Sequence, residues 1–141
     1  MKELTVTEIF SVAPPRTSTL LCLPAKDGGT DVLALPWFTW LNTKHNPMLC
    51  FSLPAKDETG NGLAAEQTLY LGFLEAEKAR AYEAPMHLPA GEAAAPLPVA
   101  FPEGTRACIR CTLFRKFKYP CQQVRLFNCN FEKAYLLKED E

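Results

Sequence analysis

The sequence has few histidines, no dinucleotide or phosphate-binding glycine motif and almost no net charge, and each absence excludes a class of function. With only His45 and His87 present, no His/Glu metal spacing, Ser/His/Asp order or Cys/His pair can be assembled. Neither GxGxxG nor GxxxxGKS/T occurs, so neither a Rossmann nor a P-loop nucleotide site is predicted. The net charge of −1 gives no global attraction to nucleic acid or to an anionic membrane.

The chain also lacks the features of membrane insertion and export. No apolar run approaches the ~20 residues that span a bilayer. The start, MKELTVTEIF, has neither the basic n-region nor the apolar h-region of a signal peptide. We therefore expect a cytoplasmic protein, and in that compartment the six cysteines argue against a disulfide framework.

Prolines and glycines are spread along the chain and divide it into short elements. Short helices are expected at 63–67 and 75–83, and residues 85–104 read as a Pro/Ala-rich loop. Alternation and β-branched or aromatic residues predict strands at 4–12, 18–23, 31–38, 48–53, 68–74, 106–117 and 124–131. About seven strands in 141 residues favour a single domain, 1–141, folded as a mostly antiparallel β-barrel.

The stretch 35–53 (LPWFTWLNTKHNPMLCFSL) holds both tryptophans and a polar cluster between two apolar flanks. Exposed amides, hydroxyls and one lysine at a strand end can bind an anionic or polar ligand that carries a ring, and indoles can form an apolar wall. The alternative is a hairpin whose aromatic side chains fill the core. The pentapeptide LPAKD occurs twice, at 23–27 and 53–57, so Lys26 and Lys56 follow similar strand ends.

Four cysteines in the last third of the chain suggest a metal site at first sight: Cys108, Cys111, Cys121 and Cys129. However, Cys108 and Cys111 lie within an alternating strand, where residues three apart project to opposite faces. Packed strand cysteines are therefore the favoured interpretation, and no metal ligand is assigned. A cysteine-rich metal site remains an alternative function.

A local basic zone carries aromatic side chains among its cations. It contains Arg110, Arg115, Lys116, Lys118 and Arg125, with Phe114, Phe117 and Tyr119. Such a mixture can bind single-stranded nucleic acid by stacking and phosphate contact. A solvated barrel face with alternating charges is the favoured interpretation. Binding of a protein or nucleic-acid partner through this face remains an alternative function.

The segment Trp37–Asn42 follows a glycine hairpin, Lys26 to Gly29, and precedes Pro47 and the strand 48–53. This order resembles the flavin reductase-like family, whose members have the FMN-binding split β-barrel fold. Family members show a Trp-aromatic-Thr-x-aliphatic-Ser segment before a proline and a hydrophobic strand. Asn42 stands where the serine is usual, and Met48 replaces a second proline. The likeness covers about residues 8–74.

The resemblance implies a homodimeric split barrel with one or two short helices that binds FMN, or alternatively FAD, at the subunit interface. It implies cofactor contacts from Thr39, Trp40, Leu41 and Asn42, with Lys56 and Thr59 on the phosphate side. The activity it implies is electron transfer or NAD(P)H-dependent flavin reduction, with a nicotinamide nucleotide or a redox protein as partner. A flavin would perform the hydride chemistry, and the protein would bind and orient it. No residue is assigned as an acid, base or nucleophile.

Overall fold

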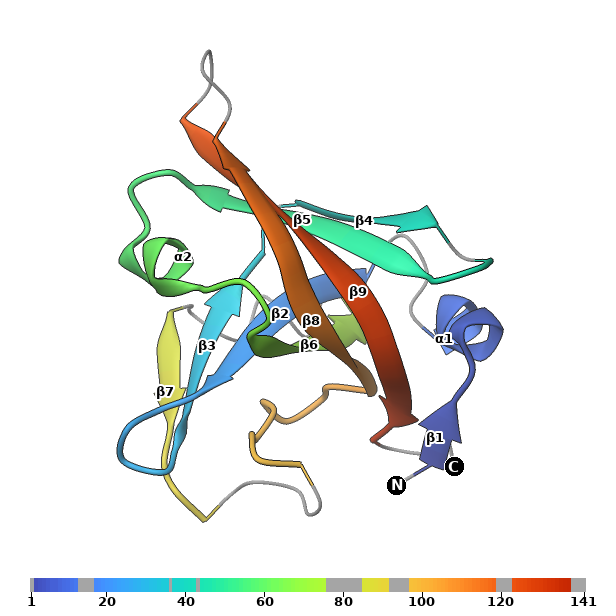
Figure 1. Cartoon of the computed structure of the whole chain (residues 1–141). Helices are drawn as coiled ribbons and strands as arrows, with labels where there is room; N and C mark the ends of the chain where they lie inside the picture. The colour runs from blue at the N-terminus through green and yellow to red at the C-terminus, as the bar shows by residue number, and fades with distance from the viewer. Residues whose placement is uncertain are drawn as a thin grey trace.

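The computed structural model describes residues 2–12, 17–35, 37–42, 44–75, 85–91, 97–118 and 123–137. Within these residues the chain forms nine strands and two short helices (Figure 1). In chain order they are β1 Lys2–Leu4, α1 Val6–Val12, β2 Thr17–Pro24, β3 Thr30–Ala34, β4 Trp37–Asn42, β5 Met48–Pro54, α2 Glu58–Gly62, β6 Thr68–Glu75, β7 Met86–Leu88, β8 Ala107–Lys118 and β9 Val124–Leu136.

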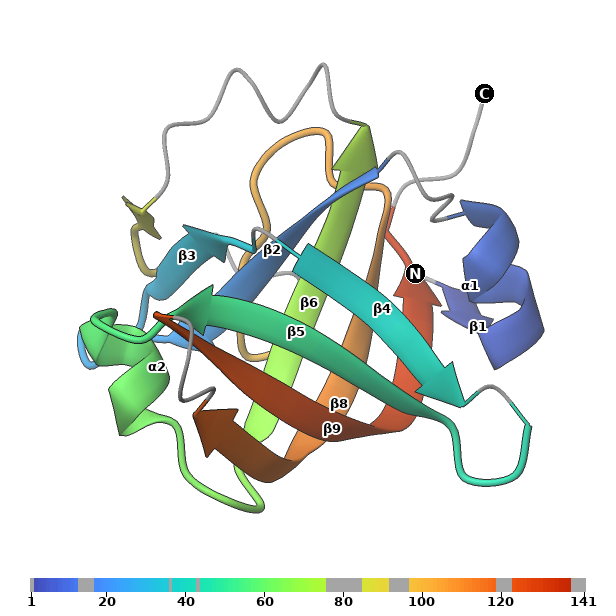
Figure 2. The same ribbon diagram turned by 90° about the horizontal axis from the view of Figure 1, so that it is seen from above.

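The strands form one antiparallel sheet in the order β4-β5-β9-β8-β6-β2-β3-β7, and β1 pairs with β9. The sheet curls into a barrel, as the view from above shows (Figure 2). Strands β3 and β4 are consecutive in the chain but lie near opposite ends of this order. The barrel is therefore split where the chain crosses from one end of the sheet to the other. This confirms the prediction of a mostly antiparallel split barrel with short helices.

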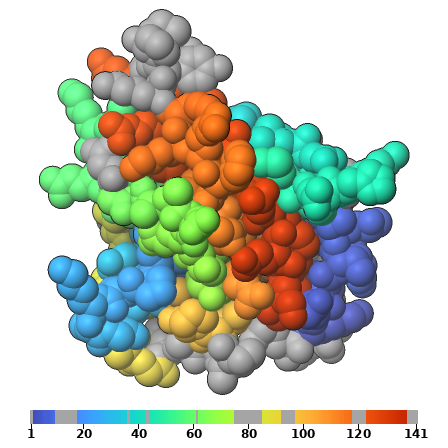
Figure 3. Space-filling model, in the orientation of Figure 1, coloured from blue at the N-terminus to red at the C-terminus, as the bar shows by residue number. Residues whose placement is uncertain are grey.

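Two apolar clusters hold the sheet together. The cluster inside the barrel takes alternate residues of the long strands, among them Leu21, Phe51 and Ile109. The second cluster takes the intervening residues of β2, β6 and β8, and Leu97 and Val99 cover it from outside the sheet. The side chains of β8 and β9 run across the middle of the face seen in Figure 3, with β1 and α1 at its side.

The predicted strand 4–12 is wrong, because the chain there forms the short strand β1 and the helix α1. The Thr5 hydroxyl accepts a hydrogen bond from the Glu8 amide, and Glu8 accepts one from the Thr5 amide, each at 3.1 Å. This reciprocal capping box starts a helix. Ile9, which is fully buried, anchors α1 in the core cluster.

Three other elements differ from the prediction. Residues 31–38 form parts of two strands, because β3 ends at Ala34 beside β2 and β4 begins at Trp37 beside a different neighbour, β5. Residues 85–104 were predicted as loop but contain β7. The helix expected at 63–67 lies earlier, as α2, because Asp57 caps it there. The helix predicted at 75–83 falls, apart from Glu75 at the end of β6, outside the described residues.

Neither helix of the described residues has the length and apolarity needed to cross a membrane.

Candidate functional site

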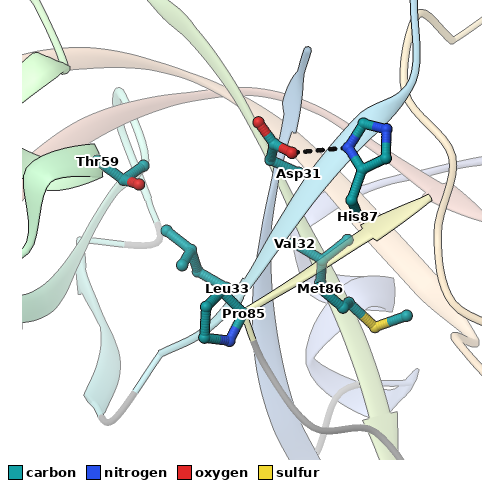
Figure 4. A pocket seen from close by; sticks show the side chains of 7 residues that line it. All are labelled: Asp31, Val32, Leu33, Thr59, Pro85, Met86 and His87. Atoms are coloured by element: carbon teal, nitrogen blue, oxygen red, sulfur yellow. Dashed lines mark hydrogen bonds and ion pairs between the residues drawn. The ribbon is translucent and has the colours of Figure 1, made fainter. Parts of the chain in front are cut away.

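A pocket of about 310 Å³ lies between α2, β3 and β7, beside the split of the barrel. Figures 1 and 2 both show these three elements side by side, and Figure 4 shows the pocket closely. Its size reaches the lower end of the range that small-molecule sites occupy. It is lined by Asp31, Val32, Leu33, Thr59, Pro85, Met86 and His87.

The register of β3 against β7 puts polar groups on one wall of the pocket. Asp31 pairs directly with His87, so their side chains project to the same face of the sheet. Leu33 lies two residues further along β3 on that face and packs against the barrel core. The wall is therefore ionic at one end and apolar at the other.

The short helix α2 supplies the opposite wall through Thr59. The Asp57 carboxylate accepts hydrogen bonds from the amides of Thr59 at 2.8 Å and Gly60 at 3.3 Å, which fixes the first turn. Gly60 is buried, and a Cβ there would lie 3.2 Å from the Phe127 ring and 3.3 Å from Leu53. The glycine thus lets α2 sit close against the end of the barrel and hold Thr59 toward the pocket.

Replacing Asp57 with alanine should cost about 1 kcal/mol of unfolding free energy, because two amides lose their acceptor. Chemical denaturation followed by tryptophan fluorescence would measure the loss. The Asp57→Asn variant keeps a side-chain oxygen and should lose only part of that stability. Equal stability of Asp57→Ala and the unsubstituted protein would contradict the cap.

His87 is held between two carboxylates. Its Nδ1 lies 2.8 Å from Asp31 Oδ1, and its Nε2 lies 2.8 Å from Asp27 Oδ2. The hydrogen bond to Asp31, followed by the one to Asp27, raises the pKa of His87 above its usual value, against an opposing effect of desolvation. The Gly29 amide donates to Asp27 at 2.8 Å and, with His87, lowers the pKa of that carboxyl. The sequence gives no local signal for this cluster, because Asp31 and Asp27 precede His87 by 56 and 60 residues.

The six residues expected to contact a cofactor lie in two separate parts of the structure. Thr59 lines the pocket, and Lys56 is exposed just before α2. Thr39, Trp40, Leu41 and Asn42 follow along β4, whose last residue pairs with Met48 at the far end of β5. At ~3.4 Å per residue, the length of β5 separates Asn42 from the pocket end by roughly 20 Å. A ligand that touches both groups must extend along the barrel.

Within β4 the residues have different surroundings. The Trp40 ring packs 5.8 Å from the rings of Phe38 and Phe131, so it contributes to the core. Asn42 donates to the His45 carbonyl at 2.7 Å and accepts from the Lys44 amide at 3.1 Å, which closes the 42–45 turn. Trp37 and Leu41 are about half exposed, and Thr39 is half-buried on the same face as Trp37. Leu41 lies where the register between β4 and β5 shifts.

The backbone of β4 adds a second feature of the site. Among the described residues β4 pairs only with β5, so it is an end strand of the sheet order. Its other edge presents amide and carbonyl groups that can hydrogen-bond to the polar edge of a ring. Together with the exposed indole of Trp37, this edge suits a flat heteroaromatic ligand.

The cysteines of the described residues do not meet at one point, although Cys111 and Cys129 contact each other. Cys108 belongs to the outer cluster, whereas Cys111 and Cys129 lie in the barrel core. Burial raises the pKa of Cys108 to about 12, so its thiol stays protonated. No group of three or more His, Cys, Asp or Glu side chains in the described part of the chain could hold a metal ion. Cys121 lies outside that part.

The predicted basic face is partly neutralised. Arg110 contacts Glu132 at 2.8 Å, and Lys116 donates to the Leu63 carbonyl at 3.0 Å. Arg115 lies over the rings of Phe114 and Phe117, with its guanidinium 5.8 and 5.7 Å from their centroids. The face is therefore mixed in character, which favours the solvated-surface interpretation over a nucleic-acid site.

An antiparallel barrel split between its end strands defines the fold class of the flavin reductases and FMN-binding split-barrel proteins. Similar solved structures cover most of the chain. They include flavoredoxin from Methanosarcina acetivorans (19% identity, TM-score 0.63, 86% of this chain and 68% of that chain) and the styrene monooxygenase flavin reductase from Pseudomonas putida S12 (13%, 0.66, 87% and 81%). The FMN-binding protein from Thermus thermophilus with bound p-hydroxybenzaldehyde is also similar (12%, 0.63, 86% and 71%).

No family model matches the chain, and no curated protein matches it by sequence. At these identities the likeness establishes a common fold. The resemblance in the sequence is thus confirmed at the level of the split barrel.

Proposed function

We propose that this protein binds a flavin, FMN or FAD, and acts in electron transfer or nicotinamide-dependent flavin reduction. The observation that carries the proposal is the split barrel, since similar solved structures with this fold are named as flavin reductases, flavoredoxin and FMN-binding proteins. A bound flavin would supply the hydride chemistry, and the chain would bind and orient it.

The open edge of β4 supports a position for the isoalloxazine ring. Those backbone amides and carbonyls of β4 that face away from β5 can satisfy the polar ring edge, and Trp37 offers an apolar surface. The exposed Trp37 and Leu41 side chains also favour a homodimer, in which a second subunit covers this strand. Asn42 would then contribute to flavin binding indirectly, by closing the turn that follows β4.

The charges around the pocket favour Lys56 and Thr59 as the phosphate side. Lys56 is an exposed cation at the entry to α2, and the Thr59 side chain reaches the pocket. Asp31 places a carboxylate on the opposite wall, where a phosphate would be repelled. A phosphate group is therefore expected beside α2.

The test is a comparison of FMN with riboflavin, which lacks the phosphate. The visible spectrum of freshly purified protein would first show whether flavin is bound, and the flavin-free protein would then be titrated with each compound. Lys56→Ala should weaken FMN binding about tenfold, as expected for loss of one charge-assisted contact. Riboflavin binding should change little.

Lys26→Ala is the matched control, because Lys26 occupies the same position in the first copy of the LPAKD pentapeptide. It should leave the affinity for both flavins unchanged. Absence of any flavin binding would refute the proposed function. Equal weakening of FMN and riboflavin by Lys56→Ala would refute the assignment of the phosphate side alone.

A further inference from the structure

Strand β7 forms one wall of the pocket, although it is only three residues long. Within the described residues it pairs with β3 alone, through Met86, His87 and Leu88. Two features fix its position beyond these backbone bonds. His87 reaches Asp31 on β3 and Asp27 in the β2–β3 turn, and Leu88 lies directly over Gly29. A Cβ at Gly29 would lie 2.3 Å from the Leu88 carbonyl oxygen, so this close approach requires glycine.

Both contacts of His87 can form together only when its ring is protonated. A neutral imidazole has one N–H donor and one lone pair, whereas the imidazolium has two donors. Each ring nitrogen lies 2.8 Å from a different carboxylate oxygen, so a neutral ring would face one carboxylate with its lone pair. The two nitrogens also point to separate carboxylates, which leaves no common point for a metal ion.

The electrostatic surroundings of His87 are simple. Among the described residues, Asp31 on β3 and Asp27 in the turn are the acidic groups that face it, and exposed Lys26 precedes Asp27. Among the described residues lining the pocket, only Asp31 and His87 titrate; α2 contributes Thr59. A change in charge at His87 therefore acts mainly on its two aspartates and on the strand that carries it.

We propose that His87 is a pH-dependent clasp, which in its protonated form fastens β7 against β3 and closes this wall of the pocket. When the ring loses its proton, one of the two contacts is lost, and β7 is held only by its backbone pairing with β3 and the remaining contact. The pocket then opens more readily on the β7 side. His87 is thus a positioning residue for any ligand in the pocket.

The pH range of the clasp follows from the direction of two pKa shifts. The pKa of His87 is raised above 6.5, so the stabilisation is complete below 6.5 and is lost as the pH rises through the raised value. The pKa of Asp27 is lowered below 3.8, so its contribution is complete above 3.8 and is lost as the pH falls through the lowered value. The contribution of His87 is therefore complete below about pH 6.5, and that of Asp27 above about pH 3.8.

NMR on the full-length protein tests the clasp without any ligand, so its outcome is independent of the flavin titration. The imidazole signals of His87 should titrate with a midpoint above 6.5, and Asp27→Asn should move that midpoint down. Amide exchange in β3 and β7, corrected for the intrinsic pH dependence of exchange, should lose protection as the pH passes the His87 midpoint. His87→Gln should remove this pH dependence.

His45→Gln is the control, since His45 lies in the turn after β4 on a different part of the barrel, and it should leave the exchange profile unchanged. If His87→Gln is poorly folded, the titration of the unsubstituted protein and Asp27→Asn still decides the question. A His87 midpoint at or below 6.5, or one that Asp27→Asn leaves in place, would overturn the proposal. Protection of β7 that does not change across the midpoint would also overturn it.

Discussion

Replacing Phe127 with alanine should lower the free energy of unfolding by about 3–5 kcal/mol, the usual cost of removing a fully buried aromatic ring. Phe127 is 0% exposed and stacks on Phe51, with ring centroids 5.0 Å apart and planes 13° apart. Its ring also lies beneath Gly60, so the cavity would open under α2 as well as in the core. Urea denaturation followed by circular dichroism would measure the loss.

Phe114→Ala provides the control, because Phe114 lies 55% exposed on β8, and its loss should change stability by less than about 1 kcal/mol. Phe127→Leu preserves most of the volume and should cost under about 1.5 kcal/mol, which keeps the test open if the alanine variant fails to fold. If Phe127→Ala and Phe114→Ala had similar stabilities, the claim that Phe127 is buried and stacked on Phe51 would be wrong.

The sequence predicted those strands in which short runs of apolar and aromatic residues are buried. Residues 48–53 and 68–74 lie in β5 and β6, where the inward residues are Leu and Phe and each strand has two neighbours. The strand predicted at 4–12 is wrong. The segment LTVTEIFSV has the β-branched content of a strand, but Thr5 and Glu8 form a capping box that starts a helix. Here the local capping bonds and the burial of Ile9 outweigh strand propensity.

Thr59, which the family resemblance suggested for the phosphate side, lines the pocket, and no sequence motif pointed to the other lining residues. Thr59 lies in the pocket because Asp57 caps α2, and both residues are close in sequence. His87 was assigned no role, because its partners Asp27 and Asp31 meet it only after β7 adds to the sheet. Gly29 was predicted as a turn residue, but what requires a glycine there is the Leu88 carbonyl.

Gly29→Ala should therefore disturb the wall of the pocket more than any other small substitution in the β2–β3 turn. The added Cβ would lie 2.3 Å from the Leu88 carbonyl oxygen and 2.9 Å from the His87 atoms Cε1 and Nε2. A backbone oxygen cannot move away without moving the strand. Such overpacking should cost about 1–3 kcal/mol, measured by denaturation at pH 6.

The displacement should also appear at His87, because its ring must leave Asp27 when β7 shifts. The NMR midpoint of His87 should fall toward 6.5 in Gly29→Ala. Gly62→Ala is the matched control: a Cβ at Gly62 meets nothing within 4 Å, and alanine in α2 should be neutral or stabilise by up to about 1 kcal/mol. If both variants keep the same stability and the same His87 midpoint, β7 does not lie against the turn, and Gly29 has no role in shaping the pocket.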